Sequence, residues 1–557
     1  MSRHGAPQPK TRAWTNRDRY TSGPDRPENG VLMHTTYPFG CDPAHGDDWL
    51  LWTYLRRNAA RHPDKTAVVH GDARRTYAAL AADAEALAGA LHAQGVGPGD
   101  VVSYQLPNCI EAMLVLLAAL RLGAVANPIT PIYRRREIEF IVRQARSKIL
   151  FVPVSYRGCE HVALALELEA PCLGAVVACG GQVPGAVAFD ELLRRGRGVP
   201  PPALAADPDA DAMLAYTSGT VANPKGARHS QRTLVADVLS TAAFTRMTPQ
   251  DVCFMASPLT HMTGALYISF LPQIHGNTLC MMDGWTPAEG ARMIARERCT
   301  WTSGATPFLQ GLVYDEDVRQ YDVSCLRVFR TGGADVPPKL IRDAQAMGIR
   351  AHRCYGSTEH PTVSGMLDGD IEKAATTDGK IHPHVELRII GDDNITVLPA
   401  GQVGEIQTRG PDRFLGYHDK ALDGDAFTAD GWFRTGDLGS VDAAGYLTIA
   451  GRRKDIIIRK GENISAKEVE DVLMEHPALQ NVAVIGVKDE ERGEMVVAVC
   501  TLHPGAQFDF DIMTRHLRHM GIARQKYPER LEILDELPMT SSGKIRKVAL
   551  RERFAAP

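Results

Sequence analysis

The chain has 557 residues, more than a single hydrophobic core usually supports, so we expect at least two domains. Hydrophobic residues make up 44% of the sequence and charged residues 23%, a globular composition that excludes general disorder. The formal net charge of -4 provides no overall positive field, which argues against nucleic acid or an anionic membrane surface as a partner.

Three features of the sequence bear on location. The first thirty residues are rich in Arg, Pro, Gly and Asp and lack an apolar run, so they predict a surface tail and no signal peptide. The most apolar stretch, Met113 to Ile129, contains Arg121 and Pro128 and is too short to span a bilayer, so no transmembrane segment is predicted. The eleven cysteines form no C-x-x-C pair, which favours a reducing compartment and a cytoplasmic location.

From residue 66 onward, short apolar runs alternate with helical patterns. Thr66 to His70 predicts a strand, and Thr76 can cap a following helix that has one apolar face and ends at Gly95. Val101 to Leu106 predicts a buried strand, and Ile110 to Leu122 predicts the helix after it. Repeated alternation of this kind is typical of parallel, doubly wound sheets, so we expect an α/β fold.

A change in composition near Gly451 predicts a second domain. Beyond it, Ile456 to Ile458 begins a new strand, and Ser465 with Glu468 is typical of a capping box that opens a helix. Further strand and helix patterns follow over 482–487, 496–502 and 512–520. The expected organisation is a tail over 1–30, a large domain over 31–451 and a small α+β domain over 452–557.

The segment Tyr216 to Ala227, with the sequence YTSGTVANPKGA, contains the strongest local signal. Its small residues, Gly219 among them, let the backbone approach a phosphate group closely. The cation of Lys225 suits the same ligand, and so do the hydroxyl groups of Thr217, Ser218 and Thr220. The spacing differs from that of a Walker loop. By itself the segment also fits a polar surface turn.

Five further motifs follow in a fixed order: TGGADVPP from Thr331, CYGSTE ending at Glu359, DGWFRTGDLG from Asp430, GRRKDIIIRKGENIS from Gly451, and PMTSSGKIRK from Pro538. Together with the segment at Tyr216, this order resembles the adenylate-forming superfamily of acyl-CoA synthetases, aryl-acid ligases, luciferases and peptide-synthetase adenylation domains. Within it, the chain is most similar to ligases that act on medium-chain and alicyclic acids such as cyclohexanecarboxylate.

The resemblance implies a fold and an activity. The fold would be a large domain of doubly wound sheets with a β-barrel-like subdomain, followed by a small, mobile α+β domain. The enzyme would convert a carboxylic acid to acyl-AMP with release of pyrophosphate, and would then transfer the acyl group to coenzyme A. ATP, Mg²⁺ and coenzyme A would be its cofactors, and a homodimer its assembly.

The resemblance also implies the nucleotide site. The β- and γ-phosphates would be held by Thr217, Ser218, Gly219, Thr220 and Lys225. Adenine would lie between the turn Gly332, Gly333, Ala334 and the ring of Tyr355, because a flat base gains from an aromatic face. Gly356, Ser357 and Thr358 would follow, with Thr358 near the α-phosphate. Glu359 would bind Mg²⁺, and Asp437 in a tight turn, assisted by Arg452, would bind the ribose hydroxyls.

Lys544 is implied as the catalytic cation. A carboxylate must attack the α-phosphorus of ATP while pyrophosphate leaves, and a desolvated ammonium group between the two anions would stabilise that transition state. Read alone, a lysine in a loop of small polar residues is most often exposed and without a role. For thioester formation the small domain would turn about Lys454, which would bring Lys460 and Gly461 against the pantetheine arm.

The acid pocket is implied around His261, which would act as a gate or wall beside the carboxylate. A lone His among apolar residues is otherwise more often part of the core. The other implied lining residues are Met262, Thr263, Gly264, Ala265, Leu266, Gly304, Ala305, Gly333, Gly356 and Met366. Nearly all of them are small or apolar, and no carboxylate lies near His261 in the sequence. We therefore expect an uncharged aliphatic or alicyclic acid and not an amino acid.

One departure and two rival hypotheses remain. Val221 and Ala222 replace the Thr-Gly pair that is usual in the phosphate segment, and Ala222 would be strained by about 1 kcal/mol if it had to adopt φ > 0. An adenylation-only enzyme that passes acyl-AMP to a carrier protein or partner ligase is the first alternative. A non-catalytic relative that only binds nucleotide is the second.

Overall fold

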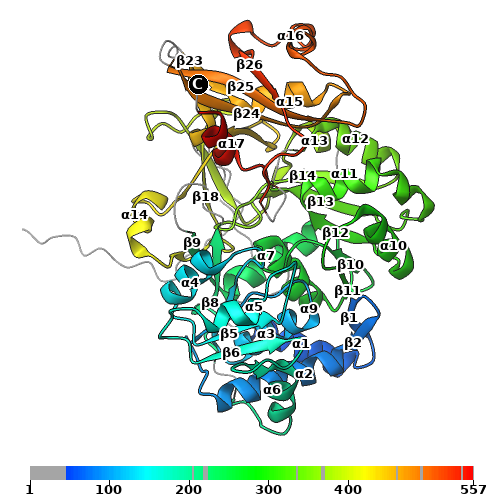
Figure 1. Cartoon of the computed structure of the whole chain (residues 1–557), viewed down its shortest axis with the longest axis vertical. Helices are drawn as coiled ribbons and strands as arrows, with labels where there is room; N and C mark the ends of the chain where they lie inside the picture. The colour runs from blue at the N-terminus through cyan, green and yellow to red at the C-terminus, as the bar shows by residue number, and fades with distance from the viewer. Residues whose placement is uncertain are drawn as a thin grey trace, which may run out of the picture.

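The computed structural model of the chain describes residues 46–203, 206–217, 224–333, 336–365, 370–459, 462–489, 493–540 and 544–555. Figure 1 shows two parts: a large body, and a smaller part on top of it that contains the C-terminal end of the chain, in orange and red. The predicted tail over 1–30 lies outside the described residues.

The first large sheet of the body is mostly parallel. Its strand order within the described residues is β19-β9-β8-β4-β3-β5-β6-β7. The last two strands in sequence, β9 and β19, pair antiparallel at one edge, and β8 and β9 form a hairpin in which Thr217 faces Lys225. The strands are β3 (Val101–Tyr104), β4 (Val125–Pro128), β5 (Ile149–Pro153), β6 (Ala175–Cys179), β7 (Val187–Ala188), β8 (Asp211–Thr217), β9 (Lys225–Ser230) and β19 (Gly416–Tyr417).

The second large sheet is also parallel except at one edge, where β2 pairs antiparallel with β1. Its order in the described part of the chain is β14-β13-β12-β10-β11-β1-β2. The strands are β1 (Thr66–His70), β2 (Ala73–Thr76), β10 (Val252–Met255), β11 (Thr278–Met281), β12 (Trp301–Gly304), β13 (Val328–Gly332) and β14 (Arg350–Cys354). The predicted doubly wound α/β fold is therefore confirmed.

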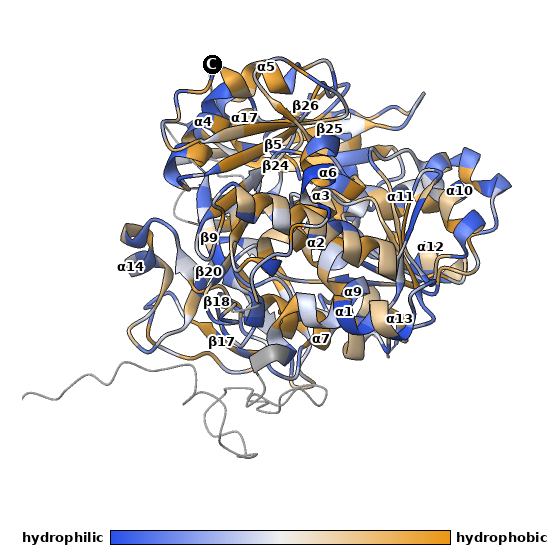
Figure 2. Cartoon of the chain, turned by 90° about the horizontal axis from the view of Figure 1, so that it is seen from below, coloured by the Kyte–Doolittle hydropathy of each residue, from blue (hydrophilic) through white to orange (hydrophobic). Residues whose placement is uncertain are grey.

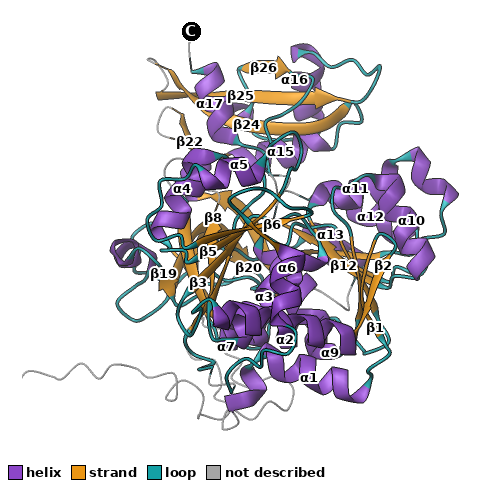
Figure 3. Cartoon of the chain, turned by 60° about the horizontal axis from the view of Figure 1, so that its bottom comes forward, coloured by secondary structure: helices purple, strands orange, loops and turns teal. Residues whose placement is uncertain are grey.

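Helices fill the space between the two sheets and cover their outer faces (Figure 3). The inner layer is α1 (Leu51–Arg61), α2 (Tyr77–Ala93), α3 (Ile110–Arg121), α6 (Phe189–Gly196), α7 (Gln231–Phe244), α8 (Met262–Gly264), the π-helical η3 (Ala265–Phe270) and α9 (Leu271–His275). The outer helices are α4 (Arg135–Gln144), α5 (His161–Leu166), α10 (Pro287–Glu297), α11 (Thr306–Tyr314), α12 (Pro338–Ala346) and α13 (Ile371–Thr376). Every residue of α3 except Glu111 is buried, which explains its apolar run.

Hydropathy follows this layering. In Figure 2 the inner helices α2 and α3 are largely orange, whereas the outer helices α4, α10 and α12 show blue residues on the side away from the sheets. The helix predicted after Thr76 begins at Tyr77, and the Thr76 side chain accepts a hydrogen bond from the backbone N–H of Ala79. The predicted N-cap is therefore confirmed.

An antiparallel sheet forms a third element of the body. It contains, in order, β17 (Glu386–Ile390), β18 (Gly404–Arg409), β20 (Phe433–Val441) and β21 (Leu447–Arg452), and its apolar face encloses a small core. Two short pieces lie beside it, the pair β15 (Ser364–Gly365) and β16 (Lys380–Ile381), and the helix α14 (Asp423–Ala426). This four-stranded antiparallel sheet corresponds to the expected barrel-like subdomain.

The C-terminal part is an α+β unit with its own sheet. The strands are β22 (Ile456–Arg459), β23 (Glu462–Ser465), β24 (Leu479–Asp489), β25 (Gly493–Leu502) and β26 (Arg530–Ile533). Apolar clusters lie on both faces of the sheet, under α15 (Ala466–Met474) and α16 (Phe510–His519) on one side and α17 (Lys547–Phe554) on the other. Ser465 caps α15 as predicted. The boundary between 451 and 452 stays a prediction.

Candidate active site

The candidate site lies where three parallel strands end. The carboxyl ends of β12, β13 and β14 are Gly304, Gly332 and Cys354, and they meet at one edge of the second sheet because the strands are parallel and adjacent. Ligands of open α/β sheets bind at such carboxyl edges. The segment before α17, which carries Lys544, closes the cavity from the C-terminal part.

Most of the predicted pocket residues line this one cavity. They are His261, Met262, Thr263, Leu266, Gly304, Ala305, Gly332, Gly333, Tyr355, Gly356, Ser357, Thr358 and Lys544. The cavity also contains residues that were not among the individually predicted site residues: Ser257, Pro258, Tyr267, Ser303, Phe308, Arg330, Cys354 and Pro361. Gly264 and Ala265 lie on the same helical segment but do not line it. A Cβ at Gly264 would lie 1.9 Å from the Pro258 carbonyl oxygen, so this glycine allows close backbone packing.

The lysine of the C-terminal part lies against the glycine turn of the large body. A Cβ built on Gly333 would lie 3.5 Å from Cε of Lys544, and Gly333 has φ of +78°, a conformation that favours glycine. The Lys544 backbone is held by two hydrogen bonds with Thr540, at 3.0 and 2.7 Å. The structure therefore brings the implied catalytic lysine and the implied adenine turn into direct proximity.

Electrostatics at Lys544 follow from this enclosure. Burial, together with the positive charge of Arg452, lowers the pKa of the Lys544 ammonium to about 8, while Asp437 and Glu359 oppose the change. His261 lies across the cavity, and burial, with a contribution from Lys544, lowers its pKa to about 4. His261 is therefore neutral at pH 7, whereas Lys544 is largely cationic.

A tyrosine, an aspartate and an arginine form one hydrogen-bonded group beside the cavity. The Tyr355 hydroxyl donates to Oδ2 of Asp437 at 2.7 Å, and Nε of Arg452 lies 3.0 Å from Oδ1 of the same carboxylate. Asp437 and Arg452 are cross-strand partners on β20 and β21. The expectation that Asp437 lies in a tight turn is wrong, because Gly436 with φ of +71° bends the chain while β20 continues through Asp437.

Glu359 lies in a second group. Its Oε1 accepts a hydrogen bond from the Tyr417 hydroxyl at 2.8 Å, and the Lys225 ammonium lies 5.3 Å from the centre of the Tyr417 ring. Lys225 faces Thr217 across the β8–β9 hairpin. None of Thr217, Lys225 and Glu359 is among the described cavity-lining residues. Glu359 directly follows Thr358 of the cavity wall, and Tyr417 links it to Lys225.

The carboxylate of Glu359 would suit a Mg²⁺ ion that is also bound by the phosphates of a nucleotide. Among the described residues, no group of three or more His, Cys, Asp and Glu side chains could hold a metal ion by itself. Mg²⁺ is usually bound by one or two carboxylates together with substrate phosphates and water, so a lone carboxylate near the phosphate hairpin suits it. Glu359 would be that ligand, with its Oε2 free of the Tyr417 bond.

The loop that carries Thr358 and Glu359 is held by residues that sequence analysis missed. Nε2 of the buried His229 donates to the Thr358 carbonyl oxygen at 2.8 Å, and Nε2 of His360 lies 2.9 Å from Oδ1 of Asp412. Burial lowers the pKa of His229 to about 4, so it remains a neutral donor. His229 lies two residues beyond the YTSGTVANPKGA segment, and nothing in its spacing indicated this contact.

Some expected residues lie outside the described part of the chain. They are Ser218, Gly219, Thr220, Val221, Ala222, Ala334, Met366, Lys460 and Gly461. Lys454, the expected pivot, lies in the short 3-10 helix η6 (Arg453–Asp455) between the two parts, and burial followed by the charge of Arg452 lowers its pKa. Whether the chain turns at Lys454 stays a prediction.

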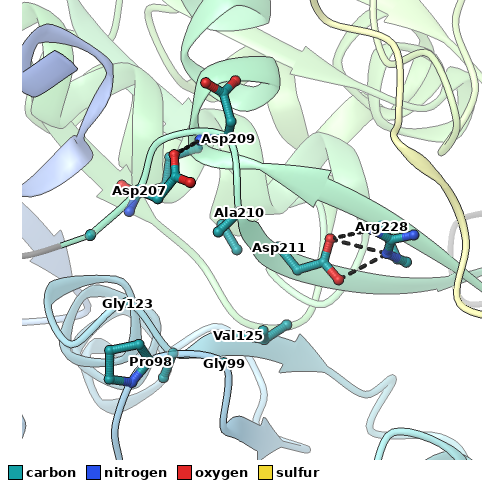
Figure 4. Close-up of a pocket in the computed structure, with 13 residues that line it drawn as sticks. Pro98, Gly99, Gly123, Val125, Asp207, Asp209, Ala210, Asp211 and Arg228 are labelled. Carbon is teal, nitrogen blue, oxygen red and sulfur yellow. Dashed lines mark hydrogen bonds and ion pairs between the residues drawn. The ribbon is translucent and has the colours of Figure 1, made fainter. Parts of the chain in front are cut away.

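A separate cavity of about 470 Å³ lies beside the first sheet, at the amino-terminal ends of β4 and β8 (Figure 4). Two of its aspartates form ion pairs with arginines. Asp211 forms an ion pair with Arg228 at 2.8 Å, and Asp209 with Arg232 at 2.7 Å. Size alone therefore does not select the functional site, and we assign no ligand to this cavity.

Comparison with known proteins identifies the family. The model of the AMP-binding enzyme family matches residues 55–418, and the model of the AMP-binding enzyme C-terminal domain matches residues 468–544. The chain belongs to the AMP-binding enzyme family. It is 35% identical over 514 residues to the medium-chain fatty-acid–CoA ligase of Escherichia coli (strain K12), a match that covers 91% of this chain and 90% of that ligase.

Two solved structures of AMP-binding enzymes share the fold. The ATP-bound MatB from Rhodopseudomonas palustris has a TM-score of 0.81 at 29% identity and covers 90% of this chain and 98% of its own. The anthranilate CoA ligase AuaEII in complex with anthranoyl-AMP has a TM-score of 0.83 at 26% identity, with coverages of 90% and 97%.

The family and these relatives make the chain an AMP-forming acid–thiol ligase. It activates a carboxylic acid with ATP as acyl-AMP and transfers the acyl group to coenzyme A. In the described ranges, the longest apolar helices fall short of what a membrane crossing requires.

Proposed function

We propose that this ligase acts on a small aliphatic or alicyclic carboxylic acid, with Mg²⁺ at Glu359 and Lys544 as the catalytic cation. The observation that carries the proposal is the approach of Lys544 to Gly333 in a cavity that also contains His261 and Tyr355. A cation of the C-terminal part in this cavity supports a role for Lys544 between the acid carboxylate and the phosphates, where adenylation requires a positive charge.

The reaction follows from the two anions involved. A carboxylate oxygen of the acid attacks the α-phosphorus, the bond to the bridging oxygen breaks, and pyrophosphate leaves with the electron pair. The Lys544 ammonium would offset the negative charge that both groups bring together. Bound Mg²⁺ would supply charge neutralisation on the phosphates. Asp437 would accept hydrogen bonds from the ribose hydroxyls, and its contacts with Tyr355 and Arg452 hold it in place for that task.

Apolar side chains in the cavity support an aliphatic or alicyclic acid as the substrate. Met262 and Leu266 are buried on the helical segment that begins after His261, and Phe308 lies opposite them on α11. Apolar side chains of this kind favour hydrocarbon over charged groups near the carboxylate. No carboxylate side chain is among the described residues that line the cavity, which supports the exclusion of amino acids.

Thioester formation would use a second arrangement of the C-terminal part. The thiol must reach the acyl carbonyl where Lys544 and pyrophosphate stood, so we propose that the C-terminal part turns about Lys454 after adenylation. Pyrophosphate exchange with ATP, Mg²⁺ and a panel of acids, followed by addition of coenzyme A, tests the proposal. Exchange without thioester would favour the adenylation-only alternative, and nucleotide binding without exchange would favour a non-catalytic relative.

We also propose a cytoplasmic location and a homodimeric assembly. The cysteines that the structure describes are free thiols, which supports a reducing compartment such as the cytoplasm. A homodimer rests on the family resemblance, and sedimentation of the purified protein tests it.

A further inference from the structure

Arg330 is a buried cation inside the acid cavity. It lies on β13 two residues before Gly332, so both residues face the same side of the sheet. Two residues along a strand span about 6.6 Å. Arg330 therefore lies that much further from the carboxyl end of β13 than Gly332, which adjoins the turn that Lys544 contacts. Arg330 and Tyr267 are both among the residues that line the cavity, and Arg330 is only 2% exposed.

The hydrogen bonds of Arg330 within the described residues leave part of its guanidinium unsatisfied. Nη1 donates to the Tyr267 hydroxyl at 2.6 Å and, more weakly, to the Thr241 hydroxyl at 3.5 Å. Nε is buried and has no hydrogen-bond partner among the described residues. A guanidinium has five N–H donors and stays protonated, and an unsatisfied buried donor is costly. An acceptor supplied by a ligand would remove that cost.

The positive charge of Arg330 is also only partly balanced by negative groups nearby. No carboxylate of the described residues forms an ion pair with Arg330 within 4 Å, although the buried Asp237 acts on it electrostatically. Burial raises the pKa of Asp237 to about 7, with Asp412 adding to the rise and Arg330 opposing it. At neutral pH Asp237 is therefore only partly ionised and only partly offsets the charge of Arg330.

We propose that Arg330 is a specificity-determining residue that binds an oxygen acceptor at the end of the acid remote from the reacting carboxylate. The acceptor is a ketone or hydroxyl oxygen, or an oxygen of a second carboxylate, and Tyr267 orients the guanidinium toward it. Met262 and Leu266 contact the hydrocarbon chain between the two ends. This inference rests on the proposed adenylation of a small acid, and it names the chemistry of the far end of that acid.

A purely structural arginine would behave differently. Arg330 also stacks its guanidinium over the Tyr267 ring, 5.4 Å from the ring centre, and could serve only to hold that helical segment. In that case its removal would lower stability and the rate with every acid by a similar factor. A specificity role predicts instead that the ratio of rates between matched acids changes, because only one of the acids has the acceptor.

The test uses three acids of similar shape: 5-methylhexanoate, 5-oxohexanoate and pentanedioate. Their C5 carries two methyl groups, one methyl group and one ketone oxygen, or the two oxygens of a second, charged carboxylate. The same triads are made with shorter and longer chains, over about four to eight carbons, because the depth of the pocket sets the best length. Initial rates of pyrophosphate release give kcat/KM for each acid with wild-type enzyme, Arg330→Met, Arg330→Lys and Tyr267→Phe.

At the best length, wild-type enzyme is expected to prefer an oxygen-ended acid over its methyl partner by about tenfold or more, as for a hydrogen bond to a charged group. Arg330→Met should invert that ratio, Arg330→Lys should retain part of it, and Tyr267→Phe should reduce it. The two oxygen-ended members separate a neutral acceptor from a second carboxylate. Arg353→Met is the control, because Arg353 is equally buried on β14 but pairs with Asp378 at 3.0 Å outside the cavity.

Two results would overturn the proposal. Wild-type enzyme that activates the methyl-ended acids and disfavours the oxygen-ended ones at every length would refute it and leave the proposed reaction intact, even if Arg330→Met did not fold. An unchanged ratio in a folded Arg330→Met would refute it as well. Wild-type enzyme that releases pyrophosphate with no acid of the panel would contradict the proposed function and the inference together.

Discussion

The carboxylate of Asp437 faces the guanidinium of Arg452 directly across the β20–β21 ladder, with Nε 3.0 Å from Oδ1. Tyr355 binds the other oxygen of the same carboxylate, so the position of Asp437 is fixed before any nucleotide arrives. Arg452 is also the last residue of β21, two residues before the proposed pivot at Lys454. One ion pair thus joins the proposed ribose site to the start of the C-terminal part.

The first prediction concerns this carboxylate. Asp437→Asn should raise KM for ATP by about 10- to 100-fold, because two hydrogen bonds to a charged acceptor become weaker bonds to a neutral one. The KM for the acid should change little. Steady-state kinetics with ATP and acid varied separately provide the measurement. Tyr355→Phe, which removes only one bond to Asp437, should show a smaller rise, and an equal loss for both substrates in Asp437→Asn would point to misfolding.

The second prediction concerns Glu359. Glu359→Gln should lower turnover strongly at ordinary Mg²⁺ concentrations while the protein stays folded, since the replacement is nearly isosteric and the proposed role is ionic. Titration of the initial rate with Mg²⁺ should show a higher requirement than in wild-type enzyme. Tyr417→Phe removes the hydroxyl that donates to Oε1 and should have a milder effect. Wild-type Mg²⁺ dependence in Glu359→Gln would remove this residue from the metal site.

A pH dependence follows from the lowered pKa of Lys544. The ammonium form is the one that stabilises the transition state, and burial holds its pKa near 8 instead of the usual value of about 10.4. The kcat/KM for adenylation, which reports the free enzyme, should therefore fall as the pH rises through about 8. Lys544→Arg should be slower but should lose this alkaline limb, because a guanidinium stays charged. An identical limb in both enzymes would assign the ionisation to another group.

Pocket shape gives a fourth prediction. Shortening Met262 or Leu266 to Ala should favour bulkier acids over smaller ones by about 1–2 kcal/mol per lost contact, measured as a changed ratio of kcat/KM between two acids. Both side chains are buried, so each variant will also lose stability, and thermal unfolding should be recorded alongside. An unchanged ratio in both folded variants would place the acid elsewhere.

The sequence allowed the architecture to be predicted where local signals were strong. Thr66 to His70 forms β1 with the predicted bounds, and Thr76 and Ser465 cap their helices, because periodicity and capping depend on neighbouring residues. The turn predicted at Asp437 failed for a local reason as well: Gly436 bends the chain within a strand, and a glycine with φ > 0 is compatible with a turn or a bend.

The site was predictable only in part, because many of its contacts join distant segments. Arg330 could have been inferred from the two-residue period of a strand that ends at Gly332, and Tyr267 from its place one helical turn beyond Thr263. His229 and Asp412 could not, since their contacts with the Thr358–His360 loop cross more than fifty residues of sequence. The approach of Lys544 to Gly333 likewise depends on how the C-terminal part sits on the body.

The central claim is that Lys544 serves adenylation from its place beside Gly333 and leaves before thioester formation. The direct measurement compares wild-type enzyme and Lys544→Ala in two separate half-reactions, pyrophosphate release from ATP and acid, and thioester formation from ready-made acyl-adenylate and coenzyme A. We expect adenylation to fall by several orders of magnitude, as loss of a preorganised cation does, and thioester formation to stay close to the wild-type rate. An equal loss in both half-reactions of a folded Lys544→Ala would contradict the account.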